Sequence, residues 1–117
     1  KKAETKLKGW GIFSNRFEDA AEYYEKAANN YKLAKAWAEA AECYVALADC
    51  NLKLDSKHDA ATAFVEASKA VSKSSKPALA PGYLQQAVAL YTDMGRLNMA
   101  ARQLREIAEM AEKAENK

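Results

Sequence analysis

Residues 40–48 read Ala-Ala-Glu-Cys-Tyr-Val-Ala-Leu-Ala, and residues 60–68, twenty positions later, read Ala-Ala-Thr-Ala-Phe-Val-Glu-Ala-Ser. Both stretches begin with an alanine pair, place an aromatic residue four positions after its first member, and place small or apolar residues seven and eight positions after it. Positions at these spacings lie on one face of an α-helix, because residues three and four apart stack on the same side. The pattern therefore predicts two helices of one repeated type.

The same register extends along most of the chain. Its alanine positions are Ala20-Ala21, Ala40-Ala41, Ala60-Ala61, Ala80 (followed by Pro81) and Ala100-Ala101. A helix with one apolar stripe cannot bury that stripe alone, and helices joined by short turns run antiparallel. We therefore predict an all-α fold in which antiparallel helical hairpins stack into an α-solenoid. A pair of units spans 40 residues, so the repeat is similar to, but longer than, the tetratricopeptide (TPR) repeat of about 34 residues.

Turn and capping signals set the expected ends of the elements. A basic segment, 1–8, is followed by helices over about 17–34, 36–54, 58–73, 80–94 and 97–114. Asn15 with Glu18 and Ser56 with Asp59 fit the capping-box pattern of a helix start, and Gly95 fits a helix end. The stretch 72–77 reads as a loop. Proline is tolerated in a first helical turn, which places Pro81 at the start of its helix. Trp37 is expected at a junction between helices.

Composition bounds the class of protein. The 117 residues are enough for one domain, 1–117, and 18 basic against 16 acidic residues give a net charge of +2, which argues against nucleic-acid binding driven by net charge. No apolar run approaches the roughly 20 residues of a membrane span, and no apolar signal core is apparent at the N-terminus. Cys43 and Cys50 lie too far apart on one helix to bridge each other. The chain is therefore expected in the cytoplasm, with free and mostly buried thiols.

No catalytic constellation emerges from the sequence. His58 is the only histidine, and no second ligand stands at metal-binding spacing, so a capping or surface role is expected for it. Phosphate-binding glycine loops and nucleophile elbows are absent from the sequence. We expect no enzyme activity, no cofactor and no metal, and we expect function to reside on a surface.

Two stretches are candidates for such a surface. Gly9-Trp10-Gly11-Ile12-Phe13-Ser14 reads as a break after the basic segment. Its large side chains, Trp10, Ile12 and Phe13, either fold back onto the first helix pair or form an apolar loop that contacts a membrane or a partner. Arg96, Arg102 and Arg105 are basic residues near a helix N-terminus, where they oppose the helix dipole. Such residues face either a partner or plain solvent.

Three strings resemble the soluble NSF attachment proteins, the SNAP adaptors. They are Tyr31-Lys32-Leu33-Ala34-Lys35-Ala36-Trp37, Asp55-Ser56-Lys57-His58-Asp59-Ala60-Ala61, and Tyr91-Thr92-Asp93-Met94-Gly95-Arg96 with Ala100-Ala101-Arg102. The resemblance covers essentially the whole chain, and the stretch 9–13 is most similar to plant-type or protist α-type members. It implies a twisted right-handed sheet of antiparallel helices.

The resemblance also implies a function. SNAP adaptors are peripheral membrane proteins of the cytoplasm that bind assembled SNARE four-helix bundles and recruit the AAA+ ATPase NSF, which unwinds them. By this resemblance Trp10, Ile12 and Phe13 form the membrane-contact loop. The basic residues matching those that face the acidic SNARE bundle are Lys35, Lys73, Arg96 and Arg102. The lysines also stand at helix ends, where dipole compensation explains them equally well.

Two departures from the family accompany this resemblance. Family members are more than twice as long, so the chain resembles their N-terminal part, without the C-terminal part that engages NSF. Ser74 to Gly82 differs from the usual loop. The alternative function is a generic TPR-like scaffold that binds a peptide or another solenoid and ignores membranes.

Overall fold

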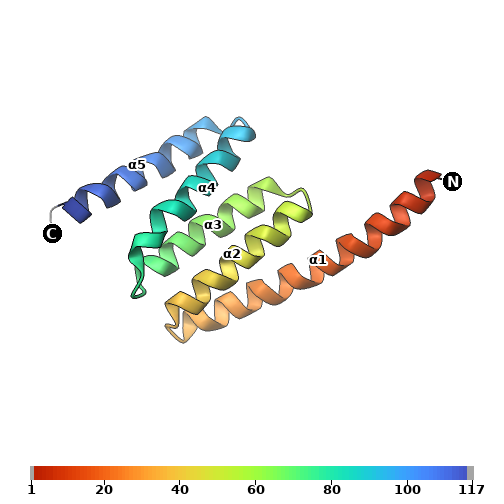
Figure 1. Cartoon of the computed structure of the whole chain (residues 1–117), viewed down its shortest axis with the longest axis horizontal. Coiled ribbons are helices and arrows are strands. Elements are labelled where there is room, and N and C mark those ends of the chain that lie inside the picture. Colours follow the sequence, from red (N-terminus) through yellow and green to blue (C-terminus); the bar gives the residue numbers. More distant parts are fainter. Residues whose placement is uncertain (1, 116–117) are drawn as a thin grey trace.

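The computed structural model describes the backbone of residues 2–115 and the side chains of residues 15–115. Within that range the chain forms five α-helices and one 3₁₀-helix, and no β-strand. The elements are α1 (Lys2–Leu33), α2 (Trp37–Lys53), α3 (Lys57–Ser72), η1 (Pro77–Leu79), α4 (Ala80–Asp93) and α5 (Leu97–Glu115). Consecutive helices run antiparallel and lie side by side in one row (Figure 1). The fold is therefore all-α and solenoid-like, as the alanine register predicts.

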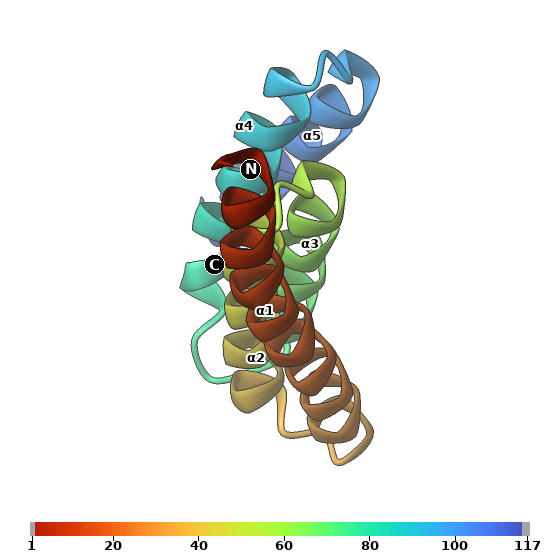
Figure 2. The ribbon, with the colours of Figure 1, turned by 90° about the vertical axis from the view of Figure 1, so that its right-hand side faces the viewer.

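The row is little more than one helix thick. Its extents are 62 × 34 × 15 Å, and the smallest is close to the roughly 10–12 Å diameter of a single helix with its side chains. The helices form a shallow zigzag, in which α3 and α5 lie on one side and α2 and α4 on the other (Figure 2). The main packing contacts of the described helices join elements that follow one another in the chain. Each inner helix is therefore covered by two neighbours and leaves two faces open.

Three of the four connections repeat one turn. Lys35, Asp55 and Gly95 each adopt a positive φ, of 60°, 60° and 74°. In each turn the next residue's N–H donates to a carbonyl oxygen five positions back, at 2.8 Å, as Ala36 does to Tyr31, Ser56 to Asn51 and Arg96 to Tyr91. This is the Schellman arrangement of helix C-termini. The twenty-residue repeat of the alanines is thus accompanied by a repeat of the turn conformation.

The core follows the alanine register. Fully or nearly fully buried residues include Ala40, Ala41, Ala60, Ala61, Ala80 and Ala100. Tyr44, Phe64 and Leu84, at the fourth position after each alanine, are buried on the same stripe, whereas Leu104 at the equivalent position of α5 is 52% exposed. The difference arises because the main packing contacts of α5 are with one helix, α4, whereas α4 packs against both α3 and α5. Alanine at the contact positions lets the backbones approach closely and gives the row its dense centre.

Most expected helix ends are confirmed within one or two residues. Pro81 lies in the first turn of α4, and Gly95 provides the positive φ of the turn that follows this helix. Trp37 packs at a junction, against a cluster formed by α2, α3 and the start of α4. Ser56 does precede α3, but its hydroxyl donates to the Asp59 carboxylate at 2.8 Å rather than capping a backbone N–H.

The expected break at Gly9–Ser14 is wrong. The helix α1 continues from Lys2 to Leu33, so the segment is helical and the predicted capping pair of Asn15 and Glu18 lies inside the helix. A glycine inside a helix costs only about 1 kcal/mol relative to alanine and does not forbid the conformation. The basic segment before it is rich in good helix formers, and no proline interrupts it.

Candidate interaction surfaces

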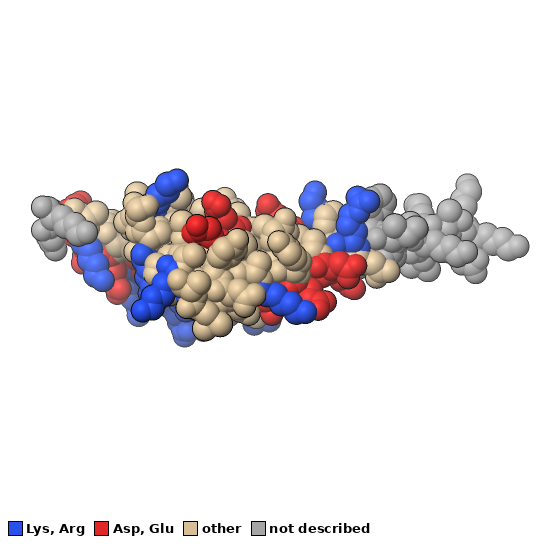
Figure 3. Space-filling view, turned by 90° about the horizontal axis from the view of Figure 1, so that it is seen from below, with Lys and Arg blue, Asp and Glu red and all other residues tan. Residues whose placement is uncertain are grey.

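Two of the four basic residues singled out by the sequence lie on the same edge of the row, where α1 and α3 end. Lys35 stands in the α1–α2 turn and Lys73 at the C-terminus of α3. Both connections lie at the lower-left ends of the helices in Figure 1. We call this edge of the row the Lys35 end, and we call the edge that bears the α2–α3 and α4–α5 turns the opposite end. Lys32 and Lys76 are also exposed beside these connections. In the view from below, Lys and Arg side chains and acidic side chains are interspersed around a patch of uncharged side chains (Figure 3).

Lys73 is held by an aromatic ring. Its Nζ lies 4.6 Å from the centroid of the Trp37 ring, within the range of a cation–π interaction. Trp37 is the first residue of α2 and Lys73 directly follows α3. The contact therefore joins two helices at the Lys35 end. Sequence reasoning found both residues but not their contact, since 36 positions separate them.

Arg96 and Arg102 lie elsewhere. Arg96 stands in the α4–α5 turn, at the opposite end of the row, and Arg102 follows on the first half of α5 (Figure 1). Both are exposed. Antiparallel helices place alternate connections at opposite ends, and α2, with 17 residues, spans about 26 Å at 1.5 Å per residue. The four cations therefore form two separated pairs, which only an elongated partner can reach together.

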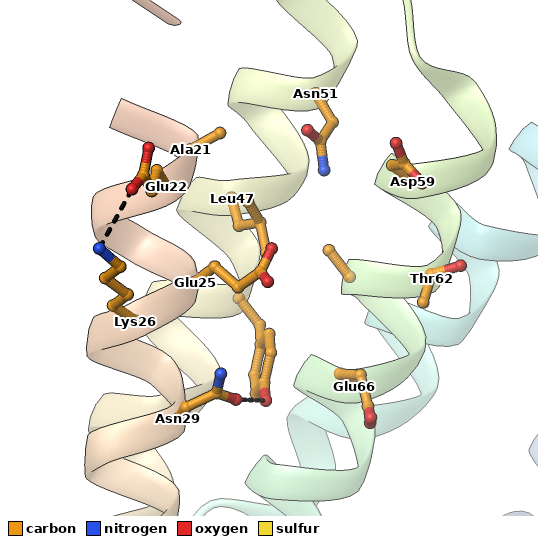
Figure 4. Close-up of a pocket in the computed structure, with 12 residues that line it drawn as sticks. Ala21, Glu22, Glu25, Lys26, Asn29, Leu47, Asn51, Asp59, Thr62 and Glu66 are labelled. Atoms are coloured by element: carbon orange, nitrogen blue, oxygen red, sulfur yellow. Dashed lines mark hydrogen bonds and ion pairs between the residues drawn. The ribbon is translucent and has the colours of Figure 1, made fainter. Parts of the chain in front are cut away.

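A groove with both apolar and charged side chains runs between α1 and α3, with α2 as its floor (Figure 4). Its volume is about 580 Å³. Glu25 reaches into it from α1, while Asp59 and Glu66 line it from α3, and Asn51 lies over the floor. Glu22 and Lys26 pair at 3.1 Å on the outer side of α1. The groove consequently carries negative charge.

Tyr44 lies at the bottom of this groove. Its hydroxyl donates to Asn29 Oδ1 at 3.3 Å, and its side chain is buried. Burial raises the pKa of Tyr44 above its ordinary value; the nearby Lys32 opposes this rise, and the carboxylates of Glu66 and Glu25 add to it. The sequence holds one signal for the groove, carboxylates on one helical face in 17–34 and in 58–73, but the sequence analysis does not predict the groove.

The groups that could carry chemistry are dispersed. Cys43 and Cys50 are free thiols, partly buried and buried respectively, and burial raises the pKa of both, with Glu42 and Asp49 adding to the shift. His58 is exposed, and its ring lies 6.4 Å from that of Tyr91. Among residues whose side chains are described, no group of His, Cys, Asp and Glu is arranged to hold a metal ion. These groups give no sign of a catalytic centre.

The expected membrane contact falls on side chains outside the described residues. Trp10, Ile12 and Phe13 belong to α1, whose backbone alone is described there. In the described part of the chain, none of the helices combines the length and apolar character needed to cross a bilayer.

Comparisons with known proteins point to one family. The family model described as soluble NSF attachment protein, SNAP, matches residues 1–117. The chain is 47% identical to an alpha-soluble NSF attachment protein of Vitis vinifera over 99% of its length and 44% identical to that of Homo sapiens over 87%. It is 37% identical to a probable vesicular-fusion protein, a sec17 homolog, of Schizosaccharomyces pombe over 86%. The chain spans 35–40% of the length of these relatives.

Proposed function

The chain belongs to the soluble NSF attachment protein family, and on this basis we propose that it is the SNARE-binding part of an adaptor that serves vesicle fusion. The adaptor binds assembled SNARE four-helix bundles and links them to the ATPase NSF, which disassembles them. The single observation that carries the proposal is the family match over residues 1–117. An adaptor of this kind works by binding and needs no catalytic centre of its own.

Charge is the proposed basis of SNARE recognition. The bundle is acidic, and Lys35, Lys73, Arg96 and Arg102 are all exposed. Their two pairs lie at opposite ends of the row, so a rod-shaped bundle laid across the helices contacts both pairs. Exposed ion pairs contribute about 0–1 kcal/mol each, so four of them give binding that is weak and falls steeply with salt. The negative groove between α1 and α3 repels the bundle and confines contact to the basic ends.

Membrane contact is the second proposed element. Trp10, Ile12 and Phe13 are the apolar residues we assign to it, and large side chains contribute roughly 1.5–3 kcal/mol each when buried in an apolar medium. Two modest affinities reinforce each other when bundle and bilayer are present together. The protein is then a peripheral membrane protein of the cytoplasm. Contact with NSF is proposed for the whole adaptor, and the chain spans 35–40% of the length of its relatives.

Co-flotation with liposomes tests the proposal. We expect the chain to float with liposomes that carry an embedded SNARE bundle, and less with bare liposomes. A Trp10→Ser/Ile12→Ser/Phe13→Ser variant tests the apolar contact, and an Arg96→Glu/Arg102→Glu variant tests the charge. Both variants should reduce flotation on bundle-bearing liposomes. A Lys57→Glu variant, which changes an exposed lysine outside the proposed set, should float like the parent.

The outcomes separate the proposal from the generic scaffold. Binding to the bundle that does not change between low and high salt contradicts charge recognition. Flotation that depends on the apolar residues but not on the bundle leaves a membrane contact without a SNARE site. A scaffold for a short peptide would show neither dependence. The family match already favours the adaptor over that scaffold.

A further inference from the structure

Lys73 differs from the other proposed SNARE-binding cations in having a described aromatic partner. Its ammonium group lies 4.6 Å from the centroid of the Trp37 ring, whereas the side chains of Lys35, Arg96 and Arg102 extend from exposed positions. A free lysine side chain samples many rotamers, and part of this freedom is lost when it binds a partner. The ring removes part of that freedom in advance.

The ring itself is fixed by packing. Trp37 is partly buried against a small cluster made by Ala40 and Ala41 of α2, Ala70 and Val71 of α3, and Ala80 of α4. Its position is therefore set by three helices, and only part of the indole faces solvent. The neighbouring backbone is also constrained, because Lys35 sits in a Schellman turn closed by the Ala36 N–H to Tyr31. Lys35 and Lys73 thus project from a rigid end of the row.

We propose that Trp37 is a positioning residue that orients the Lys73 ammonium toward an acidic partner, so that the Lys35 end is a preorganised anion-binding surface. Because an ammonium has three N–H donors, one over a ring still has donors for a carboxylate. Preorganisation raises affinity by lowering the cost of ordering on binding. The inference rests on the proposed function for the identity of the partner, but the positioning itself concerns any acidic surface.

Four variants test the inference against two probes. Trp37→Leu removes the ring, Trp37→Phe keeps a ring, Lys73→Ala removes the cation, and the fourth combines Trp37→Leu with Lys73→Ala. Binding is measured at low salt to a poly-glutamate peptide and to a soluble SNARE bundle. We expect Trp37→Leu to weaken binding about two- to five-fold, the range that a cation–π contact of 0.5–1 kcal/mol predicts. Lys73→Ala should weaken it at least as much, the double variant no more than Lys73→Ala, and Trp37→Phe should largely restore it.

A measurement without any partner completes the test. In the free protein, NMR should show the terminal methylene protons of Lys73 shifted upfield by the ring, with the shift lost in Trp37→Leu and kept in part in Trp37→Phe. Thermal unfolding of each variant shows whether it remains folded. An absent upfield shift, additive losses in the double variant, or tighter binding by Trp37→Leu would each overturn the inference. Loss of poly-glutamate binding as expected, with no binding of the SNARE bundle by the parent, would instead refute the proposed function and leave the positioning role standing.

Discussion

Asp55 and Gly95 occupy the same backbone position in equivalent turns, with φ of 60° and 74°. The N–H of each donates to the carbonyl oxygen three residues back, Asp55 to Leu52 and Gly95 to Thr92, both at 3.0 Å. Glycine adopts this left-handed conformation without a steric clash, because it has no Cβ. Other residues adopt it at a cost in conformational energy. The turn after α2 is therefore strained where the turn after α4 is not.

Replacing Asp55 by glycine should relieve this strain. We expect Asp55→Gly to raise the free energy of unfolding by about 0.5–1 kcal/mol, because the penalty of a left-handed non-glycine residue exceeds the entropy cost of glycine. Urea denaturation followed by circular dichroism measures the change. Asp49→Gly, at an exposed position inside α2, is the matched control and should lower stability by about 1 kcal/mol. A less stable Asp55→Gly protein would contradict the strain argument.

Leu84 and Leu104 hold the same position in the repeat but differ in burial. Leu84 is completely buried and Leu104 is 52% exposed. Leu84→Ala should lower the free energy of unfolding by about 2–5 kcal/mol, because it leaves a cavity in the core. Leu104→Ala removes the same atoms from a half-exposed site and should cost less than half as much. Equal losses in the two variants, measured by urea denaturation, would show that the register does not determine stability.

Reversing the charges at the Lys35 end should weaken binding to a SNARE bundle. The Lys35→Glu/Lys73→Glu variant replaces two attractive contacts by repulsive ones, and we expect about a ten-fold loss of affinity at low salt, equivalent to 1.4 kcal/mol. Titration calorimetry at several salt concentrations should also give a shallower dependence on salt than the parent shows. Lys57→Glu, at the other end of the row, should keep the parent's affinity. A loss of the same size in Lys57→Glu would reduce the effect to net charge alone.

The thiols of Cys43, partly buried, and Cys50, buried, make stability depend on pH in the alkaline range. Burial raises the pKa of Cys43 and Cys50 above their ordinary value of 9.0. The folded state thus favours the protonated thiols, and this contribution is fully present below about pH 9 and is lost as the pH rises further. Under reducing conditions we expect lower stability at pH 10 than at pH 8. A Cys43→Ala/Cys50→Ala variant should show a smaller decline, while Tyr44, whose pKa is also raised, maintains part of it. An unchanged decline would exclude the thiols as its cause.

The parts of the fold that the sequence predicted depend on local chemistry. Alanine pairs twenty residues apart mark the helix contacts, Gly95 marks a turn that requires positive φ, and Pro81 marks a first helical turn. Each signal acts within a few residues of itself. For the same reason the predicted ends of α2, α3, α4 and α5 agree with the structure within one or two residues.

The parts that the sequence did not predict depend on competition or on contacts between distant residues. At Gly9–Ser14 two glycines suggested a break, but their cost is small against the propensity of the residues around them, and α1 continues. The Ser56 hydroxyl donates to the Asp59 carboxylate and makes no capping bond to the backbone of α3. The contact of Lys73 with Trp37 and the groove between α1 and α3 join residues from different helices. No spacing within one helix encodes them.

The one-helix-thick row also determines how the protein folds and opens. When each helix packs mainly on the next one along the chain, contacts are close in sequence, which favours fast folding that propagates from one helix to its neighbours. The third helix buries eight of its residues and the fifth only two. Hydrogen exchange should therefore be slower in α3 than in α5, so that the helix bearing Arg102 opens locally while α3 stays folded.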